Sequence, residues 1–185
     1  MENKGYMGKI LHVDLTANEI REETLADSVY ETYLGGMGLG AYVLHEKIPA
    51  GADPLGPDNI LGFLPGLLTG TGSFFTGRWM VVGKSPLTGG WGDANCGGTF
   101  SPAIKRCGYD GIFISGISEK PVYLFVDDHV KALRDASEVW GMDAVETERF
   151  LGKKEGNNGK QPKVACIGPA GESVSLISGI ATDKG

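Results

Sequence analysis

The chain has 185 residues, a net charge of −6 and 30 glycines, which is about twice the usual glycine frequency of ~7%. Hydrophobic residues make up 41% of the chain, and no Gly-X-Y period exists, so the composition excludes collagen and extensive disorder. The negative charge argues against general binding to nucleic acids or anionic membranes. These features predict one compact domain with many tight turns or close backbone approaches.

The cellular compartment is predicted from the ends and the cysteines of the chain. The N-terminus lacks the apolar stretch of a signal peptide, and no apolar run reaches the ~18 residues of a membrane span. Cys96, Cys107 and Cys166 are widely spaced, form no C-x-x-C motif and cannot supply the four thiolates of an ordinary iron–sulfur cluster. We therefore expect a cytoplasmic protein with reduced thiols.

In the first half, alternating apolar residues predict a hairpin, and helical spacing follows it. Asp27 or Ser28 is a candidate cap for the first helix, which Gly35 and Gly36 would end. The predicted elements are strands at 8–15 and 19–24, helices from 27 to about 34 and from about 39 to 46, and strands at 59–64 and 79–82.

In the second half, Pro102 suits the first turn of a short helix, and Asp143 with Glu146 forms a capping box before a longer one. The predicted elements are a helix at 101–106, a strand at 111–115, a hairpin of 122–126 with 130–134, a helix at 143–151 and a strand at 163–167 that turns at 168–171. Strands outnumber helices and many are joined by hairpins, which does not fit a doubly wound parallel sheet.

The densest glycine stretch is residues 65–98, where ten of 34 positions are glycine. Such a stretch suits a flat ligand lying against the backbone, with Arg78 available for a bidentate phosphate contact. An arginine paired with a surface carboxylate is the commoner alternative, and the chemistry alone favours it. Residues 35–40 contain four glycines and open a helix that could receive a phosphate, but no dinucleotide or P-loop motif is present, and these glycines also suit packed turns.

Many ordered motifs resemble the N-terminal domain of the tungsten-containing aldehyde:ferredoxin oxidoreductase family. In chain order they are GKILHVDL at 8–15, YLGG at 33–36, DPL at 53–55, GLLTGT at 66–71, GR at 77–78, KSPLTG at 84–89, NCGG at 95–98, GYD at 108–110, KPVY at 120–123, RDAS at 134–137 and IGPAGE at 167–172. The resemblance covers essentially the whole chain, residues 1–185. It implies an α+β fold with two related halves, in which stacked β-sheets are flanked by helices in α/β/β/α layers. A faint duplication agrees with it, since Gly35-Gly36 and Gly97-Gly98 each precede a helix and an apolar strand.

The resemblance also implies a cofactor site. Arg78 matches the family arginine that contacts a pterin phosphate, and Asn95 matches the asparagine whose main-chain carbonyl helps bind the Mg²⁺ that bridges two phosphates. Gly97 and Gly98 match glycines where a side chain would collide with the cofactor. Cys96 commonly aligns with serine, so we interpret its side chain as loop packing, with only its backbone near the cofactor.

One departure from the family pattern concerns residue 37. Met37 lies where many relatives carry arginine, so a cation expected beside the double glycine is missing. Cys107 and Cys166 are interpreted as small core residues.

Two interpretations stay open for Lys84 and for Asp93. Lys84 either contacts a phosphate or is solvated. Asp93 either joins the magnesium shell through a water molecule or plays no part in the site. The three histidines show no metal-ligand spacing, and Asp110 is expected in a turn rather than in catalysis. An aromatic group either walls the cofactor or forms core: Phe74, Phe75, Trp79 and Trp91.

The parent function implied by the resemblance is oxidation of aldehydes to carboxylic acids. Tungsten or molybdenum would be held by two pterins, and electrons would pass through a 4Fe-4S cluster to ferredoxin. This chain would carry no catalytic residue and would be inactive alone, because the cluster-binding and catalytic domains are absent from residues 1–185. Its partners would be those domains or a separate subunit, and a homodimer across the exposed cofactor face is expected. The alternatives are a stand-alone pterin-binding or assembly module and a nucleotide-binding module.

Overall fold

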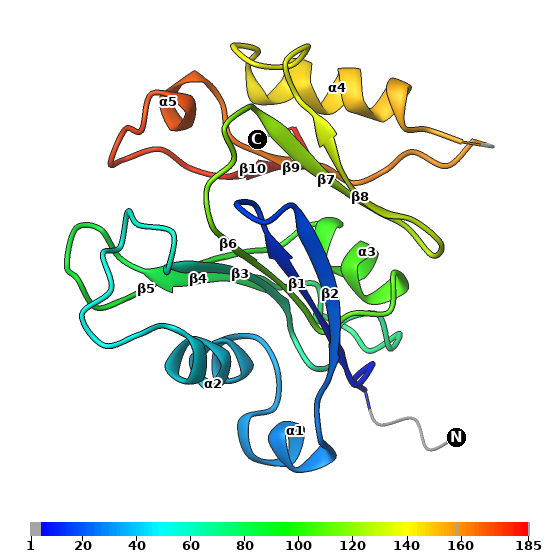
Figure 1. The fold of residues 1–185 in the computed structure, drawn as a ribbon. Helices are drawn as coiled ribbons and strands as arrows, with labels where there is room; N and C mark the ends of the chain where they lie inside the picture. Colours follow the sequence, from blue (N-terminus) through cyan, green and yellow to red (C-terminus); the bar gives the residue numbers. More distant parts are fainter. Residues whose placement is uncertain (1–4, 158, 185) are drawn as a thin grey trace.

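The computed structural model describes residues 5–157 and 159–184, and it stacks them in layers. Helices α1 and α2 lie below a six-stranded sheet, two small two-stranded sheets lie above it, and α4 and α5 lie on top (Figure 1). The α+β class and the predicted α/β/β/α layering are therefore confirmed.

The strands are β1 (Lys9–Asp14), β2 (Glu19–Thr24), β3 (Ile60–Pro65), β4 (Trp79–Lys84), β5 (Trp91–Cys96), β6 (Gly111–Ser115), β7 (Val122–Val126), β8 (Lys131–Asp135), β9 (Ala165–Cys166) and β10 (Ala181–Thr182). The helices are α1 (Asp27–Tyr33), α2 (Met37–Lys47), α3 (Phe100–Arg106), α4 (Ala144–Lys154) and α5 (Pro169–Glu172).

The large sheet has the strand order β2-β1-β6-β3-β4-β5. Strands β1 and β6 are parallel, and every other neighbouring pair in this sheet is antiparallel. In both halves of the chain a double glycine precedes a helix and then a strand of this sheet, and those strands, β3 and β6, pair with each other. Strand β5 is the last in the order, so it forms an edge of the sheet.

The period of two along each strand divides the core between the two faces of the sheet. Ile10 of β1 and Phe113 of β6 join the cluster beneath the sheet, together with the buried side of α2. Leu11 and Ile112, their chain neighbours, join the cluster above it with Ile104 of α3. Alternate residues thus stabilise both neighbouring layers, and each buried aliphatic side chain contributes roughly 1.5–3 kcal/mol.

Two glycines let α2 lie close against the sheet. A Cβ at Gly40 would lie 2.9 Å from a methyl group of Val82, and one at Gly62 would lie 2.9 Å from both Val82 and the Phe113 ring. Atoms in protein interiors do not approach so closely, so a side chain at either position would push the helix or the ring away. These glycines are therefore required by packing.

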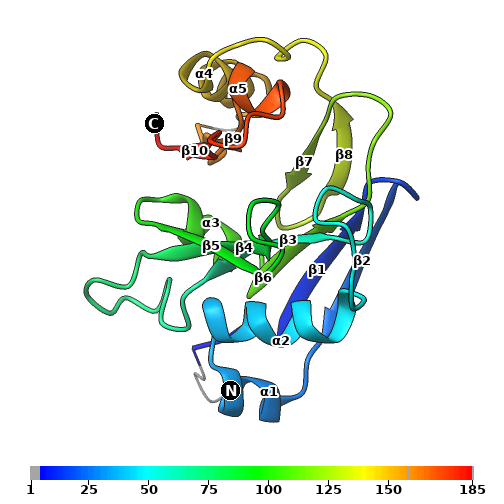
Figure 2. The same ribbon diagram turned by 90° about the vertical axis from the view of Figure 1, so that its left-hand side faces the viewer.

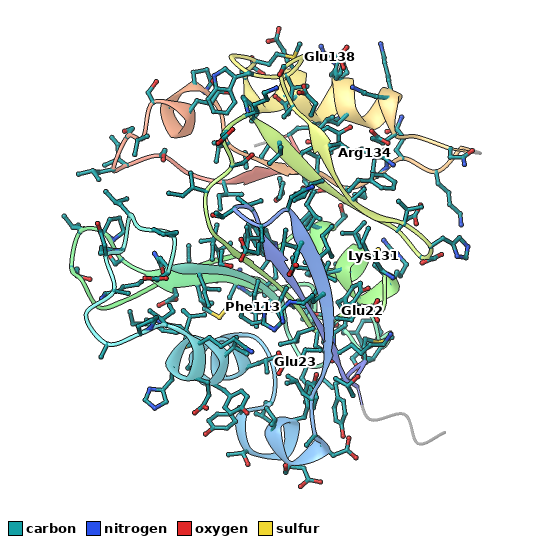
Figure 3. The ribbon with its side chains drawn as sticks, in the orientation of Figure 1. Glu22, Glu23, Phe113, Lys131, Arg134 and Glu138 are labelled. Atoms are coloured by element: carbon teal, nitrogen blue, oxygen red, sulfur yellow. The ribbon has the colours of Figure 1, made fainter. Side chains whose placement is uncertain are left out.

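A polar cluster around Glu22 of β2 joins the large sheet to the β7–β8 hairpin above it. Its carboxylate accepts hydrogen bonds from the Tyr109 hydroxyl at 2.5 Å and from Lys9 Nζ at 3.2 Å, and it pairs with Lys131 of β8 at 2.9 Å. Figure 3 shows Lys131 directed from the upper hairpin toward Glu22. The contact ties the edge of the large sheet to the β7–β8 hairpin.

A second polar cluster holds the N-terminal segment. Asp110 is buried, and it accepts hydrogen bonds from the backbone N–H groups of Met7 and Gly8 at 2.8–3.0 Å and from Lys105 Nζ at 2.5 Å. Lys105 also donates to the Gly5 carbonyl at 3.1 Å. Asp110, which we expected in a turn, thus forms a buried ion pair with Lys105 of α3. This pair holds residues 5–8 against α3.

The upper layer is more open than the lower one. An apolar cavity of about 390 Å³ lies between the large sheet and the small sheets, and its wall includes Cys107 and Cys166. Both thiols are half-buried, and burial raises the pKa of each above its ordinary value. The two residues pack as small apolar groups, as predicted.

Several predicted elements differ in detail from the structure. Helix α1 begins at Asp27, so Ala26 and not Asp27 or Ser28 occupies the N-cap position, and it makes no side-chain capping bond. The Asp143 cap of α4 is confirmed, since its carboxylate accepts from the Glu146 N–H at 2.8 Å. Strand 163–167 is reduced to β9, and the turn after it forms α5. Strands β5 (Trp91–Cys96) and β10 (Ala181–Thr182) were not predicted.

Candidate functional site

The five predicted site residues meet at one end of the β4–β5 hairpin. Arg78 directly precedes β4, and the register places Trp79 opposite Cys96 and Met80 opposite Asn95. An Arg78 guanidinium N–H donates to the side-chain oxygen of Asn95. Gly97 and Gly98 directly follow β5, and Figure 2 shows β4 and β5 on the left-hand side of the large sheet. The structure therefore brings together residues that are separated by up to 20 positions.

Arg78 pairs with an amide and not with a carboxylate. Within residues 5–157 and 159–184, no acidic oxygen lies within 4.0 Å of its guanidinium. The surface ion pair that the chemistry alone favoured is therefore wrong. An exposed guanidinium without an anionic partner keeps its charge and most of its donors available to an incoming anion.

The face of the hairpin that carries Asn95 is also the face toward α2. Residues directly opposite in an antiparallel pair point to the same side, so Asn95 shares its face with Met80, which packs on the α2 cluster. A Cβ at Gly36 would lie 4.0 Å from the Met80 sulfur, so the beginning of α2 is close by. The site thus lies where the β4–β5 end meets the N-terminus of α2.

The double glycine before α2 has a packing reason of its own. A Cβ at Gly35 would lie 3.0 Å from the Leu67 backbone nitrogen, and the Gly36 N–H donates to the Pro65 carbonyl at 3.1 Å. Met37, which follows the double glycine, is 48% exposed. The segment packs against the loop after β3, as the turn-packing interpretation predicted.

Gly97 and Gly98 are glycines for different reasons. Gly98 has φ +92°, and a Cβ there would lie 2.3 Å from a carboxylate oxygen of Asp183. Gly97 has no left-handed backbone, and a Cβ there would meet no described atom within 4 Å. Its carbonyl accepts a hydrogen bond from the Trp79 indole at 3.1 Å. Folding alone therefore explains glycine at position 98, whereas position 97 offers open space, and no described atom there requires glycine.

Asp183 is a part of the site that the sequence did not reveal. It accepts a hydrogen bond from the Thr99 N–H at 2.8 Å and another from the Thr99 hydroxyl. Partial burial opposes ionisation, but these two bonds hold the pKa of Asp183 below its ordinary value. A fixed negative charge beside Gly98 is suited to a cation and not to a bare phosphate.

The Cys96 side chain corrects one prediction. It is exposed in strand β5 rather than packed in a loop. Five of the six residues of β5 are exposed, and β5 forms an edge of the large sheet. The described part of the chain holds no group of three or more His, Cys, Asp or Glu side chains that suits a metal ion.

The remaining candidates are spread along the β4–β5 hairpin and the loop that precedes it. Lys84 is half-buried at the end of β4 far from Arg78, and its Nζ donates to the Ala52 carbonyl at 2.5 Å. Asp93 accepts from the Trp91 indole at 2.8 Å on the surface of β5. The aromatic group divides: Trp79 is buried in the core, Trp91 is partly exposed, and Phe74 and Phe75 are exposed.

Of the histidines, His12 has a defined partner. It lies 2.7 Å from a Glu23 oxygen and stacks on Phe113. Burial lowers its pKa despite the Glu23 contact. It is a packing residue, as predicted.

The described residues also bear on membrane association. None of the helices within residues 5–157 and 159–184 is both long and apolar enough to cross a bilayer.

The chain is similar to known proteins over most of its length. Residues 10–185 match the family described as "Aldehyde ferredoxin oxidoreductase, N-terminal domain". A tungsten-containing aldehyde ferredoxin oxidoreductase of Pyrococcus abyssi is 45% identical over 91% of this chain and 28% of its own length. The enzyme of the same description from Thermococcus kodakarensis is 43% identical over 97% of this chain and 29% of its own. The chain therefore spans less than a third of these relatives.

A solved structure is also similar, namely the active site complex BamBC of benzoyl coenzyme A reductase with 1,5 dienoyl-CoA. It has a TM-score of 0.92 and 35% identity, and the match covers 97% of this chain and 27% of that one. The family match, the sequence relatives and this structure all agree with the layered fold and with the ordered motifs. The chain belongs to the aldehyde ferredoxin oxidoreductase N-terminal domain family.

Proposed function

We propose that this domain forms one wall of the binding site for a tungsten–bis-pterin cofactor, with molybdenum as the alternative metal, in an aldehyde-oxidising enzyme. The observation that carries the proposal is the Arg78 end of the β4–β5 hairpin. There a guanidinium that has no acidic partner among the described residues, an exposed edge strand and the open position at Gly97 lie together. A flat, phosphate-bearing ligand needs this combination of a cation, backbone and empty space.

Each site residue has a distinct task in this proposal. Arg78 binds a pterin phosphate, and Asn95 orients the guanidinium with its side chain while its main-chain carbonyl contacts Mg²⁺. Gly97 and Gly98 admit the cofactor to the backbone, and Cys96 contributes backbone only. Asp183 lies close enough to Gly98 to favour a cation there. When bound, the tungsten centre supplies the two-electron oxidation, while this chain binds and orients it.

The reaction itself belongs to the remainder of the parent enzyme. In this proposal the other domains, or a separate subunit, supply the 4Fe-4S cluster and the catalytic groups, and ferredoxin accepts the electrons in the cytoplasm. The isolated 185-residue chain then has no aldehyde oxidation activity. Its uncovered cofactor face favours a homodimer, which sedimentation over a range of concentrations would detect.

The substrate class rests on the relatives rather than on the site. Similarity to the aldehyde ferredoxin oxidoreductases favours an aldehyde. The likeness to the benzoyl coenzyme A reductase complex indicates that the same domain also serves a different reaction. The wall proposed here would support the cofactor in either case.

Cofactor content tests the proposal most directly. The parent enzyme, expressed with tungstate, should contain tungsten and pterin in a ratio near one to two. Arg78→Ala should lower both together, because a lost bidentate phosphate contact weakens binding by about tenfold or more. Arg149→Ala removes an exposed arginine from α4 and serves as the matched control. An Arg78 variant with full cofactor content, or turnover by the isolated chain, would contradict the proposal.

A further inference from the structure

The loop between β3 and β4 is firmly held at its base. Thr69 is buried, and its hydroxyl donates to the Thr76 carbonyl at 2.6 Å, which closes the loop on itself. The Ser101 hydroxyl donates to the Gly77 carbonyl at 2.9 Å, which fixes the end of the loop to α3. The conformation of the loop is therefore set by bonds at its base.

The tip of this loop carries two aromatic side chains in water. Phe74 is 90% exposed and Phe75 is fully exposed. Their rings contact each other, with centroids 6.4 Å apart. Phe75 also has φ +60°, a left-handed conformation that is unfavourable for a bulky side chain. Strained backbone that presents large apolar side chains to solvent is characteristic of binding sites.

We infer that the Phe74-Phe75 tip is an anchor that inserts into an apolar recess in the remaining polypeptide of the parent enzyme and holds it over the cofactor site. This inference rests on the proposed function. Arg78 follows Phe75 by three residues, so the tip borders the proposed phosphate contact. A covering layer that closes over the site must therefore pass the tip.

The area of the tip favours this occupant over a second copy of the chain. An aromatic side chain buries about 150–250 Å², so the two rings supply about 300–500 Å². A stable interface between separate proteins needs about 800 Å² from each partner. A segment of the same molecule needs less, because the connection removes most of the entropy loss of association.

The relatives have the polypeptide that this occupant requires. The matched region makes up 28–29% of the two aldehyde ferredoxin oxidoreductases compared above. Most of each relative thus lies outside the region shared with this chain. That remainder is the source of the recess.

Hydroxyl-radical footprinting with mass spectrometry measures the exposure of each ring. Phe74 and Phe75 should be oxidised readily in the 185-residue chain and several-fold more slowly in the full-length parent enzyme. Equal oxidation in both proteins would overturn the inference. Protection that appears in the short chain and disappears on dilution would assign the tip to a second copy and would also overturn it.

The double variant Phe74→Ser/Phe75→Ser tests the same anchor through the stability of the parent enzyme. It should lower the melting temperature of the parent enzyme and speed hydrogen exchange over residues 66–77, yet leave the stability of the short chain unchanged. Leu87→Ser, which changes an exposed leucine at the opposite hairpin end, is the control. A parent enzyme as stable with the double variant as without it would overturn the inference.

Cofactor content separates this inference from the proposed function. A parent enzyme that contains pterin but leaves both rings exposed would overturn the anchor alone. One that protects the rings but contains no pterin would overturn the cofactor site alone.

Discussion

The Arg78 guanidinium donates a hydrogen bond to the side-chain oxygen of Asn95, across the end of the β4–β5 hairpin. The two residues therefore act as one unit, although the family resemblance assigns them to different parts of the cofactor. The amide aligns the guanidinium and leaves its positive charge intact. A carboxylate at the same position would neutralise that charge.

This relationship predicts the order of two substitutions at position 95. Asn95→Ala should reduce cofactor content modestly, because Arg78 loses its orientation but keeps its charge. Asn95→Asp should reduce it by about tenfold, since an ion pair with Arg78 competes with the phosphate. Tungsten and pterin analysis of the parent enzyme measures both. Equal effects would show that the side chain of residue 95 has no influence on Arg78.

The two adjacent glycines should separate folding from binding. Gly98→Ala forces a side chain into a left-handed backbone and should destabilise the chain by about 1–3 kcal/mol. Gly97→Ala should leave the free energy of unfolding nearly unchanged and instead lower cofactor content. Urea unfolding of the 185-residue chain and pterin analysis of the parent enzyme distinguish the two variants. Similar unfolding curves for both would contradict the assignment.

The Glu22 cluster should make stability depend on acid pH. The Tyr109 hydroxyl bond, followed by the bonds from Lys131 and Lys9, lowers the pKa of Glu22 from 4.5 to about 2. Because the folded chain holds this proton less tightly than the unfolded chain, the contribution is complete above pH 4.5 and is lost as pH falls toward 2. Urea unfolding of the wild type and Glu22→Gln should differ most at neutral pH and converge in this window. A constant difference would rule out the Glu22 carboxylate as the cause.

The buried pair of Asp110 and Lys105 should tolerate little change. Asp110→Asn leaves the Lys105 ammonium buried without a countercharge, which costs about 3–5 kcal/mol. It also weakens the two backbone bonds that hold residues 7 and 8. Thermal unfolding checks the loss, with the exposed Asp128→Asn as control. If both variants melted together, the pair would have no structural role.

Local signals explain which elements could be predicted from the sequence. The Asp143 cap bonds to a residue three positions away, so a short motif contains all the information. Strand β6 is a largely apolar run, and β1 carries buried apolar residues at Ile10, Leu11 and Val13 between a glycine and a turn. Strand β5 escaped prediction because an exposed edge strand needs no alternating apolar residues, and WGDANC has none.

The site residues likewise divide into those that the sequence motifs revealed and those whose contacts depend on the folded structure. The family motifs placed Arg78, Asn95 and the glycines near one another, but the hydrogen bond between the first two depends on the register of β4 with β5. Asp183 was missed because its partner Thr99 lies 84 positions away. Contacts of that range arise from packing of the layers, and no local pattern encodes them.

The exposure of β5 has a consequence for how this domain tolerates sequence change. A cofactor that lies along an uncovered sheet margin contacts mostly peptide groups, which every amino acid other than proline supplies alike. Apart from Asn95, whose side chain bonds to Arg78, the side chains along residues 91–96 are then free to vary during evolution, while the course of the main chain and the glycines beside it are not. Divergence between family members would concentrate in these other side chains of the strand, even where the same cofactor is retained.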